Sequence, residues 1–335
     1  MFSTIVFFAE RLTRRNLFFE KKYIDPQKDS TLFSNNVTKV NAAIIVLARN
    51  RELDSLCETM KNFEERWNKK YNYPYIFLND EEFTPEFKAL TKATTRSEVH
   101  YGLIPKDMWD YPPWIDQTKA AEVREKMIEQ NVIYGGSESY RHMCRFNSGF
   151  FFRHELVQKY DYYWRIEPGV SFMCDIDYDP FRFIQKNNIT YGFTISLLEV
   201  QSTIPTLWET VERFIDEHPQ DVNENNFLDF LKMKLIGGYN GCHFWSNFEI
   251  GDLNFWRSRK YIKFFEYLDQ AGGFYYERWG DAPVHSIALA LFLEKSKVHF
   301  FNDIAYLHPP FQHCPAQKMF HESGKCQCNP SDSFG

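Results

Sequence analysis

Residues 160–179, YDYYWRIEPGVSFMCDIDYD, are the stretch that decides the fold. Aromatic and β-branched residues at 162–166 predict a strand, which Pro168 and Gly169 interrupt. In open α/β sheets, ligands bind beyond the carboxyl ends of the strands. Acidic side chains at such an edge can hold a divalent cation and, through it, a diphosphate. The acids that follow this predicted strand are Glu167, Asp175, Asp177 and Asp179.

The aspartates of this stretch also have a plainer structural interpretation. The sequence DYDPF places Asp179 directly before Pro180, a pattern typical of the start of a helix. The aspartates would then be turn residues and helix caps rather than cation ligands. From the residues alone, both interpretations stay open.

A strand–helix–strand unit lies near the N-terminus. Residues 41–50, NAAIIVLARN, predict a buried strand, and residues 73–80, YPYIFLND, predict a second one. Apolar residues at helical spacing lie between them, so we expect the two strands to pair in parallel within an α/β sheet. The helical stripe consists of Leu53, Leu56, Met60, Phe63 and Trp67.

Two arginines, Arg49 and Arg51, follow the first predicted strand. At this position the N-terminus of a helix and two guanidinium groups can together hold the phosphates of a nucleotide. Two solvated loop arginines would show the same pattern. The residues alone therefore do not decide between a binding role and a surface role.

The composition restricts the class of partner. The net charge is -6 and no long run of Lys or Arg occurs, which argues against nucleic acid as the main partner. No stretch reaches the roughly 18 to 20 apolar residues of a membrane span. Residues 1–39 show no clear period and are interpreted as a stem-like segment, and residues 40–335 as a single domain.

Aromatic and polar side chains occur together at residues 239–258, YNGCHFWSNFEIGDLNFWRS, with the acid Glu249 among them. Apolar rings stack on sugar faces while amides and acids bind hydroxyl groups, so this composition is typical of a carbohydrate site. A core strand that carries some buried polar groups would look similar.

The C-terminal third adds further expected elements. Residues 189–197 predict a strand, and residues 298–315 predict a last strand followed by His308 before two prolines. A lone loop histidine is more often ordinary than catalytic. Asp281 precedes a strongly amphipathic helix and is well placed to cap it.

The chain has seven cysteines, an odd number that leaves at least one thiol free. Three of them lie in loop-like sequence near the C-terminus, where we expect disulfides if the chain enters an oxidising compartment. These three are Cys314, Cys326 and Cys328.

Several motifs of this chain occur together in one known family: WRIEP with CDIDYD, YRHMC, NFEIG, RWGDAP and YLHPP. With them the chain resembles the fungal Kre2/Mnt1 family of α-1,2-mannosyltransferases, glycosyltransferase family 15, from about Asn41 to about Pro330. The resemblance implies a GT-A fold with a Rossmann-like mixed sheet flanked by helices, GDP-mannose as donor, Mn2+ as cofactor, a mannose-terminated glycan as acceptor, and retention of configuration.

The resemblance implies two metal ligands. Glu167 of WRIEP takes the place of the acid that other GT-A enzymes supply from an Asp-x-Asp motif, and His308 of YLHPP is the second protein ligand. A carboxylate and an imidazole suit Mn2+ and leave other coordination positions for diphosphate oxygens and water.

The resemblance also implies roles for other residues. Tyr140 corresponds to a tyrosine near donor and acceptor, and Glu249 to the proposed nucleophile. Asp281 corresponds to an acid near the acceptor mannose, a role that competes with helix capping. Either Arg49 or Arg51 is expected to face the guanosine diphosphate. Attack by Glu249 and front-face attack by the acceptor both remain open.

Members of the family are type II membrane proteins of the Golgi lumen, so we expect membrane contact only through an anchor that is absent from this chain. Two alternatives remain for function: a GT-A transferase that uses another nucleotide sugar, or a catalytically weak relative that acts as a glycan-binding or scaffolding subunit. The complete set of Glu167, His308, Tyr140 and Glu249 speaks against the second, because a binding module needs no metal site.

Overall fold

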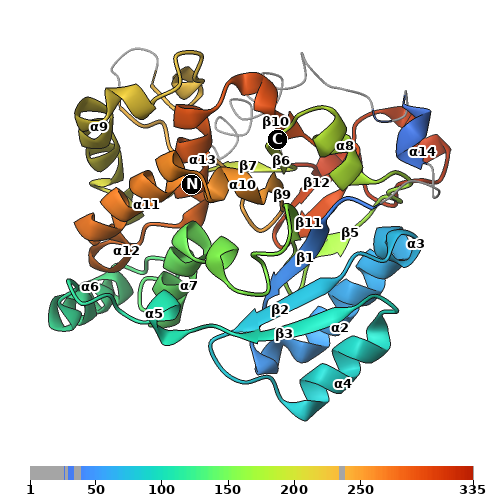
Figure 1. Cartoon of the computed structure of the whole chain (residues 1–335), viewed down its shortest axis with the longest axis horizontal. Helices are drawn as coiled ribbons and strands as arrows, with labels where there is room; N and C mark the ends of the chain where they lie inside the picture. The colour runs from blue at the N-terminus through green and yellow to red at the C-terminus, as the bar shows by residue number, and fades with distance from the viewer. Residues whose placement is uncertain (1–25, 27–28, 34–38, 234–237, 335) are drawn as a thin grey trace.

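A seven-stranded mixed sheet forms the centre of the computed structural model, which describes residues 26, 29–33, 39–233 and 238–334 (Figure 1). Its strands are β1 (Ala42–Leu47), β2 (Tyr75–Asn79), β3 (Val99–Leu103), β4 (Tyr162–Arg165), β6 (Tyr191–Phe193), β9 (Glu249–Asp252) and β10 (Val298–Phe300). The strand order is β10-β6-β9-β4-β1-β2-β3, with β9 antiparallel to both neighbours and all other pairs parallel. Most of the predicted stem-like segment 1–39 lies outside the described residues.

Helices cover both faces of this sheet (Figure 1). Alternate residues of a strand point to opposite faces, and in β1 Ile44 packs with residues of α2 and α4 while Ile45 packs with residues of α7 and α13. The helices are α2 (Leu53–Phe63), α3 (Lys69–Tyr71), α4 (Pro85–Thr94), α5 (Lys106–Trp109), α6 (Gln117–Glu129), α7 (Glu138–Gly149), α8 (Pro180–Lys186), α9 (Leu207–Glu217), α10 (Leu253–Trp256), α11 (Arg259–Ala271), α12 (Gly273–Tyr276), α13 (Asp281–Phe292) and α14 (Lys318–Glu322).

The strand–helix–strand prediction is confirmed. β1 pairs in parallel with β2, which places Ile44 opposite Tyr75, and α2 connects the two strands. β4 lies on the other side of β1, with Ala42 opposite Tyr162. The carboxyl ends of β1, β2 and β4 therefore lie at one edge of the sheet, and this edge is where ligands bind in open α/β folds.

The strand predicted at residues 189–197 is divided between two sheets. Its first part forms β6 in the central sheet, and its second part forms β7 (Ser196–Leu198), which pairs with β8 (Cys242–Phe244). Apolar residues alternate with small or polar ones across the division, so the pattern gives no sign of the point where the chain changes sheets.

The last predicted strand is divided in the same way. Residues 298–300 form β10, whereas His308 ends a separate strand, β11 (Tyr306–His308). The buried polar residues Asn302 and Asp303 occupy the turn between the two strands. β11 lies between two strands of a small antiparallel sheet, β5 (Ser171–Phe172) and β12 (Phe311–His313).

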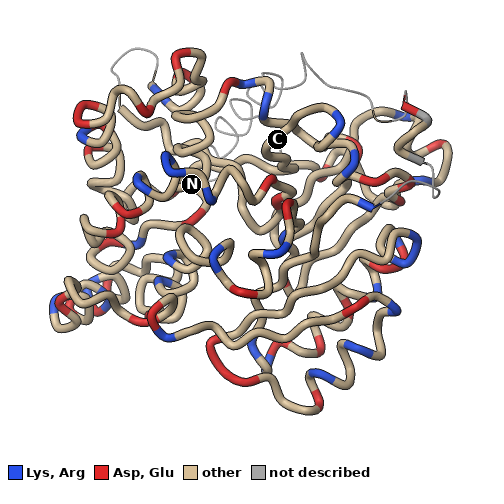
Figure 2. Tube along the Cα trace, in the orientation of Figure 1, with Lys and Arg blue, Asp and Glu red and all other residues tan. Residues whose placement is uncertain are grey.

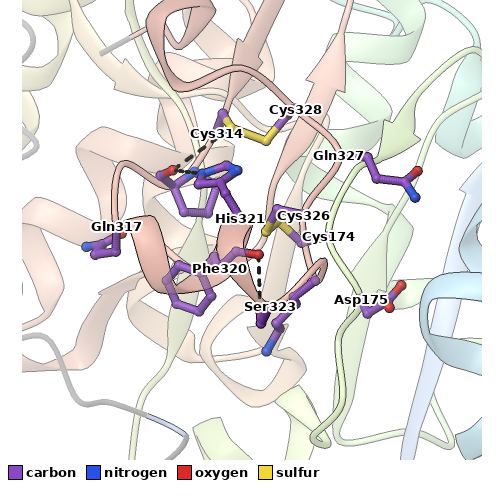
Figure 3. Close-up of a disulfide and its surroundings, with 12 residues drawn as sticks. Cys174, Asp175, Cys314, Gln317, Phe320, His321, Ser323, Cys326, Gln327 and Cys328 are labelled. Carbon is purple, nitrogen blue, oxygen red and sulfur yellow. Dashed lines mark hydrogen bonds between the residues drawn. A yellow bond between two sulfur atoms is a disulfide. The ribbon is translucent and has the colours of Figure 1, made fainter.

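Two disulfides fasten the C-terminal segment to this small sheet, and both lie close together (Figure 3). Cys326 is bonded to Cys174, which follows β5, and Cys328 is bonded to Cys314, which follows β12. The expected bond in the tail is confirmed, and Cys174 is a partner that sequence analysis did not single out. The cysteines outside these two disulfides are Cys57, Cys144 and Cys242.

Replacing Cys174 and Cys326 together by alanine should lower the free energy of unfolding by up to about 5 kcal/mol, because the bond closes a long loop in the unfolded chain. The two cysteines lie 152 residues apart, whereas Cys314 and Cys328 lie 14 residues apart. Replacing Cys314 and Cys328 together by alanine is the matched control and should lower the free energy of unfolding by about 3 kcal/mol. Urea denaturation measures both values, and equal losses would contradict loop closure as the source of the difference.

Charged residues of both signs are interspersed along the chain (Figure 2). Some of them fix helices within the fold: Arg145 of α7 forms two parallel bonds to Asp269 of α11, at 2.8 and 2.9 Å, and both residues are buried. Within the described ranges, no helix has the length and apolar character required to cross a bilayer.

Candidate active site

One arginine joins three of the predicted acids at the edge of the central sheet. Arg165 ends β4 and lies directly opposite Glu249, the first residue of β9, in the antiparallel register of the two strands. Arg165 Nη1 donates to Asp281 Oδ2 at 2.6 Å and lies 3.5 Å from Glu249 Oε1. Its Nη2 donates to Glu167 Oε1 at 2.6 Å. Strand pairing therefore gathers acids that are far apart in the sequence.

Arg165, Glu249 and Asp281 are buried, Glu167 is partly exposed, and the charges of the four side chains depend on one another. Burial works to lower the pKa of Arg165, but the carboxylates of Asp281, Glu167 and Glu249 raise it well above its ordinary value. Burial likewise works to raise the pKa of Glu167, but the charge of Arg165 and the neighbouring His308, 3.7 Å away, lower it to about 2. Glu167 is therefore a carboxylate throughout the physiological pH range.

Asp281 does not cap its helix, so the capping prediction is wrong. The N-cap of α13 is Gly280, which makes no side-chain capping bond. Asp281 Oδ2 instead accepts from Arg165 and, at 2.9 Å, from Ser246 Oγ. The buried guanidinium gives a charge-assisted bond that is stronger than a bond from a neutral backbone amide.

Glu167 and His308 lie next to each other, as expected for two ligands of one cation. Glu167 Oε2 is 3.7 Å from His308 Nε2. His308 Nδ1 lies 3.1 Å from the backbone carbonyl of Pro309, to which it can only donate, so the lone pair of a neutral ring is on Nε2. Ligand atoms at right angles around a cation with bonds of about 2.1 Å lie about 3 Å apart. The residues present therefore fit a divalent cation after a small adjustment.

Glu167 and His308 form a pair rather than a complete set of metal-ligating side chains. Among the residues that the structure describes, no group of three or more His, Cys, Asp or Glu side chains is arranged to hold a metal ion. Burial works to lower the pKa of His308, and the adjacent Glu167 raises it above its ordinary value. Because a ligating imidazole is neutral, cation binding here would release a proton.

The three aspartates after β5 have separate structural partners, so their interpretation as turn and cap residues holds. Asp179 caps α8 by accepting from the backbone amides of Phe181 and Arg182. The side-chain partners are Arg66 for Asp175 at 2.7 Å, Lys325 for Asp177 at 3.0 Å and Tyr73 for Asp179 at 2.7 Å.

Tyr140 lies in the first turn of α7, beside the acid cluster. Its ring stacks on Tyr134 with centroids 4.7 Å apart, and the guanidinium of Arg278 lies 5.2 Å from its ring centre. Burial raises the pKa of Tyr140 well above its ordinary value, and the nearby charge of Asp281 raises it further. The hydroxyl therefore keeps its proton and is a hydrogen-bond donor at physiological pH.

The two candidate arginines have different surroundings. Arg49 Nη2 donates at 3.0 Å to Ser139 Oγ, and Ser139 immediately precedes Tyr140 in α7. Arg51 is exposed on the short turn Asn50–Glu52 that follows β1. The structure therefore brings Arg49, and not Arg51, to the edge where Tyr140 lies.

A small cavity on the α7 side of the sheet contains residues that sequence analysis did not single out. Arg165 and Asn147 line it together with Glu249. Asn147 is 5% exposed, and within the described part of the chain its Nδ2 has no hydrogen-bond partner. A further residue, His285, contacts Glu249 from α13. Sequence spacing could have indicated two of these residues, because residues two apart in a strand or four apart in a helix share a face. Arg165 lies two residues before Glu167, and His285 lies four residues after Asp281.

Fold and site together define a class of protein. The solved structure of core-mannan synthase A (CmsA/Ktr4) from Aspergillus fumigatus, in its Mn/GDP form, matches this chain with a TM-score of 0.85 at 46% sequence identity. The match covers 90% of this chain and 82% of that one. The protein is a glycosyltransferase with a GT-A fold, as the sequence predicts.

Sequence comparison narrows the class to one family. A family model described as glycolipid 2-alpha-mannosyltransferase matches residues 11–335. Glycolipid 2-alpha-mannosyltransferase 1 of Candida albicans is 54% identical over 309 residues, which are 92% of this chain and 72% of that protein. Alpha-1,2 mannosyltransferase KTR1 of Saccharomyces cerevisiae is 54% identical over 293 residues, 88% of this chain and 75% of that protein. The chain belongs to this family, as its motifs indicate.

Proposed function

We propose that the protein is a Mn2+-dependent, retaining α-1,2-mannosyltransferase that transfers mannose from GDP-mannose to a terminal mannose of an acceptor glycan. The observation that carries this proposal is the placement of Glu167 and His308 at one end of Arg165, with Glu249 and Asp281 at the other. The expected metal ligand Glu167 and the two acids expected near the sugars, Glu249 and Asp281, therefore contact the same buried guanidinium group. The names of the relatives support mannose as the transferred sugar.

The chain's own residues divide into a donor side and an acceptor side. Glu167 and His308 would hold the cation, which supplies positive charge to the diphosphate as the sugar leaves. Arg49 binds a phosphate oxygen, and Tyr140 donates a hydrogen bond to the departing GDP. On the other side, Asp281 accepts from a hydroxyl of the acceptor mannose.

Glu249 has two possible roles in a retaining transfer. In double displacement its carboxylate attacks C1 from the face opposite GDP, the C1–O bond to phosphate breaks, and GDP departs with the electron pair. The acceptor hydroxyl then attacks C1, the bond between C1 and Glu249 breaks and frees the carboxylate, and the hydroxyl proton passes to a phosphate oxygen of the bound GDP. In front-face transfer the acceptor attacks on the side that GDP leaves, and Glu249 only binds a hydroxyl.

The direct test is incubation of the protein with GDP-mannose, Mn2+ and α-methyl mannoside, followed by linkage analysis of the product. We expect an α-1,2-linked dimannoside whose formation stops when a chelator removes the cation. UDP-glucose and UDP-galactose, tested under the same conditions, are the control donors. Transfer from either of them, and not from GDP-mannose, would contradict the proposal and favour another nucleotide sugar.

We also propose that the protein works in the oxidising lumen of the secretory pathway, in the Golgi. Two disulfides support this location. The sequon Asn188-Ile189-Thr190 begins with an exposed asparagine at a left-handed turn (φ 53°) between α8 and β6. A second sequon, at Asn36, lies outside the described residues.

This protein, when it is expressed in yeast and secreted, should therefore carry an N-glycan on Asn188. Endoglycosidase treatment should reduce its mass on a gel, and peptide mapping should locate the sugar on the peptide that contains Asn188. Thr190→Ala leaves the asparagine in place but removes the sequon, so it should abolish this glycan. An unmodified Asn188 in the secreted protein would count against the lumenal location.

A further inference from the structure

His285 is enclosed between two elements that carry active-site residues. It lies one turn after Asp281 in α13 and is fully buried. Its Nδ1 is 3.0 Å from Glu249 Oε2, and its Nε2 is 3.0 Å from the backbone oxygen of Asn147. Asn147 belongs to the last turn of α7, where backbone carbonyls have no partner within the helix. The ring therefore bridges β9 and the end of α7.

These two contacts fix the number of protons on the pair. A backbone carbonyl only accepts, so Nε2 carries a hydrogen. If the ring were neutral, Nδ1 would present a lone pair to Glu249, and a hydrogen bond would then require a protonated carboxyl group. The pair of Glu249 and His285 therefore holds one proton beyond the one on Nε2, and that proton is either on Nδ1 or on Oε2.

The surroundings favour Nδ1 of His285 as the position of this second proton. Arg165 lies 3.5 Å from the other carboxylate oxygen of Glu249, and its positive charge favours the ionised carboxylate. The ring of Trp256 in α10 lies 4.2 Å from that of His285, and an aromatic ring at this distance favours a cation. The negative charge of Asp281, which shares Nη1 of Arg165 with Glu249, also lies near the pair. Three buried tyrosines face it as well, and burial raises their pKa well above the ordinary value: Tyr163 on β4, Tyr191 on β6 and Tyr261 on α11.

We propose that His285, as an imidazolium, is the positioning residue of Glu249. Nδ1–H holds Oε2 of the carboxylate, so the group cannot rotate and Oε1 stays on the side of Arg165. Nε2–H donates to the backbone oxygen of Asn147 at the end of α7, so Asn147, which lines the cavity, keeps a fixed position relative to the carboxylate of Glu249. A fixed carboxylate spends more time in the geometry that transfer requires. This inference rests on the proposed transferase function.

Two variants separate this role from a structural one. His285→Asn places an amide nitrogen near the position of Nδ1 and can keep the bond to Glu249, whereas His285→Gln reaches the position of Nε2 and can keep only the bond to Asn147. We expect kcat to fall about 100-fold in His285→Gln and less than 10-fold in His285→Asn, with the KM for GDP-mannose unchanged in both. The reverse order, or equal effects of the two variants, would overturn the proposal.

A second measurement does not depend on activity. Ring-nitrogen NMR of protein labelled in histidine should show both nitrogens of His285 protonated at neutral pH. The signal is assigned by its loss in His285→Asn or, if that variant does not fold, by contacts with the ring of Trp256. One unprotonated nitrogen would overturn the proposal. Absence of mannose transfer by the wild-type protein would instead overturn the proposed function, and the NMR result would still decide the state of His285.

Discussion

Glu167→Ala is expected to lower kcat for mannose transfer by at least about 1,000-fold while the protein remains folded. The change removes the charged ligand of the cation and leaves the negative charge on the departing diphosphate poorly neutralised, a loss of about 4 kcal/mol in transition-state stabilisation. Rates at saturating Mn2+ measure the fall in kcat, and calorimetric titration with Mn2+ measures the loss of cation affinity. Near-ultraviolet circular dichroism checks the fold.

The matched control is Asp175→Ala, which removes an acid from the same stretch of sequence. Asp175 pairs with Arg66 and its side chain is 58% exposed, so Mn2+ affinity and transfer should stay close to wild type. Loss of Mn2+ binding in Asp175→Ala or Asp177→Ala, together with normal binding in Glu167→Ala, would show that the metal ligands are misassigned.

If transfer proceeds by double displacement, Glu249→Gln should reduce it by at least about 1,000-fold and leave GDP-mannose binding intact. The amide keeps the size of the side chain and much of its hydrogen bonding but cannot act as a nucleophile. A short-lived intermediate should then be trappable in the wild-type protein as mannose mass on the peptide that contains Glu249. Quenched-flow mass spectrometry makes this measurement.

Asp252→Asn is a suitable control within the same strand. Asp252 ends β9 and caps α10 by accepting from the amide of Asn254 at 2.8 Å, and asparagine caps helices about as well. This variant should transfer mannose normally. If Glu249→Gln also kept substantial transfer, the nucleophile role would be excluded and front-face attack favoured, with Tyr140 supporting the departing GDP.

Local patterns were sufficient to predict the first part of the fold. Two apolar runs with a helical stripe between them in residues 41–80 predict a parallel strand–helix–strand unit, because both strands and their connecting helix are contiguous in the chain. The pattern could not show where the chain changes sheets, as it does between β6 and β7. The same alternating pattern satisfies either sheet equally well, so only tertiary packing decides.

The acids of the candidate site were predicted from motifs, but the residue that connects them was not. Arg165 lies two positions before Glu167 and was treated as part of a strand. Its importance comes from pairing with Glu249 across 84 residues of sequence, a register that no local pattern encodes. The sequence also predicted an amphipathic helix with Asp281 as its cap, whereas every residue of α13 is buried and Asp281 contacts an arginine of β4. The sequence around Asp281 could not reveal that partner, because it comes from a distant strand.

The register of β4 and β9 also sets which changes of length this protein can tolerate during evolution. A one-residue insertion or deletion within either strand would turn every following side chain to the opposite face of the sheet. In β4, where Arg165 is the last residue, such a change would place Arg165 and Glu249 on different faces even if all active-site residues were retained. Length variation among functional descendants should therefore be excluded from β4, and a library of single-residue deletions should lose all active clones at this strand.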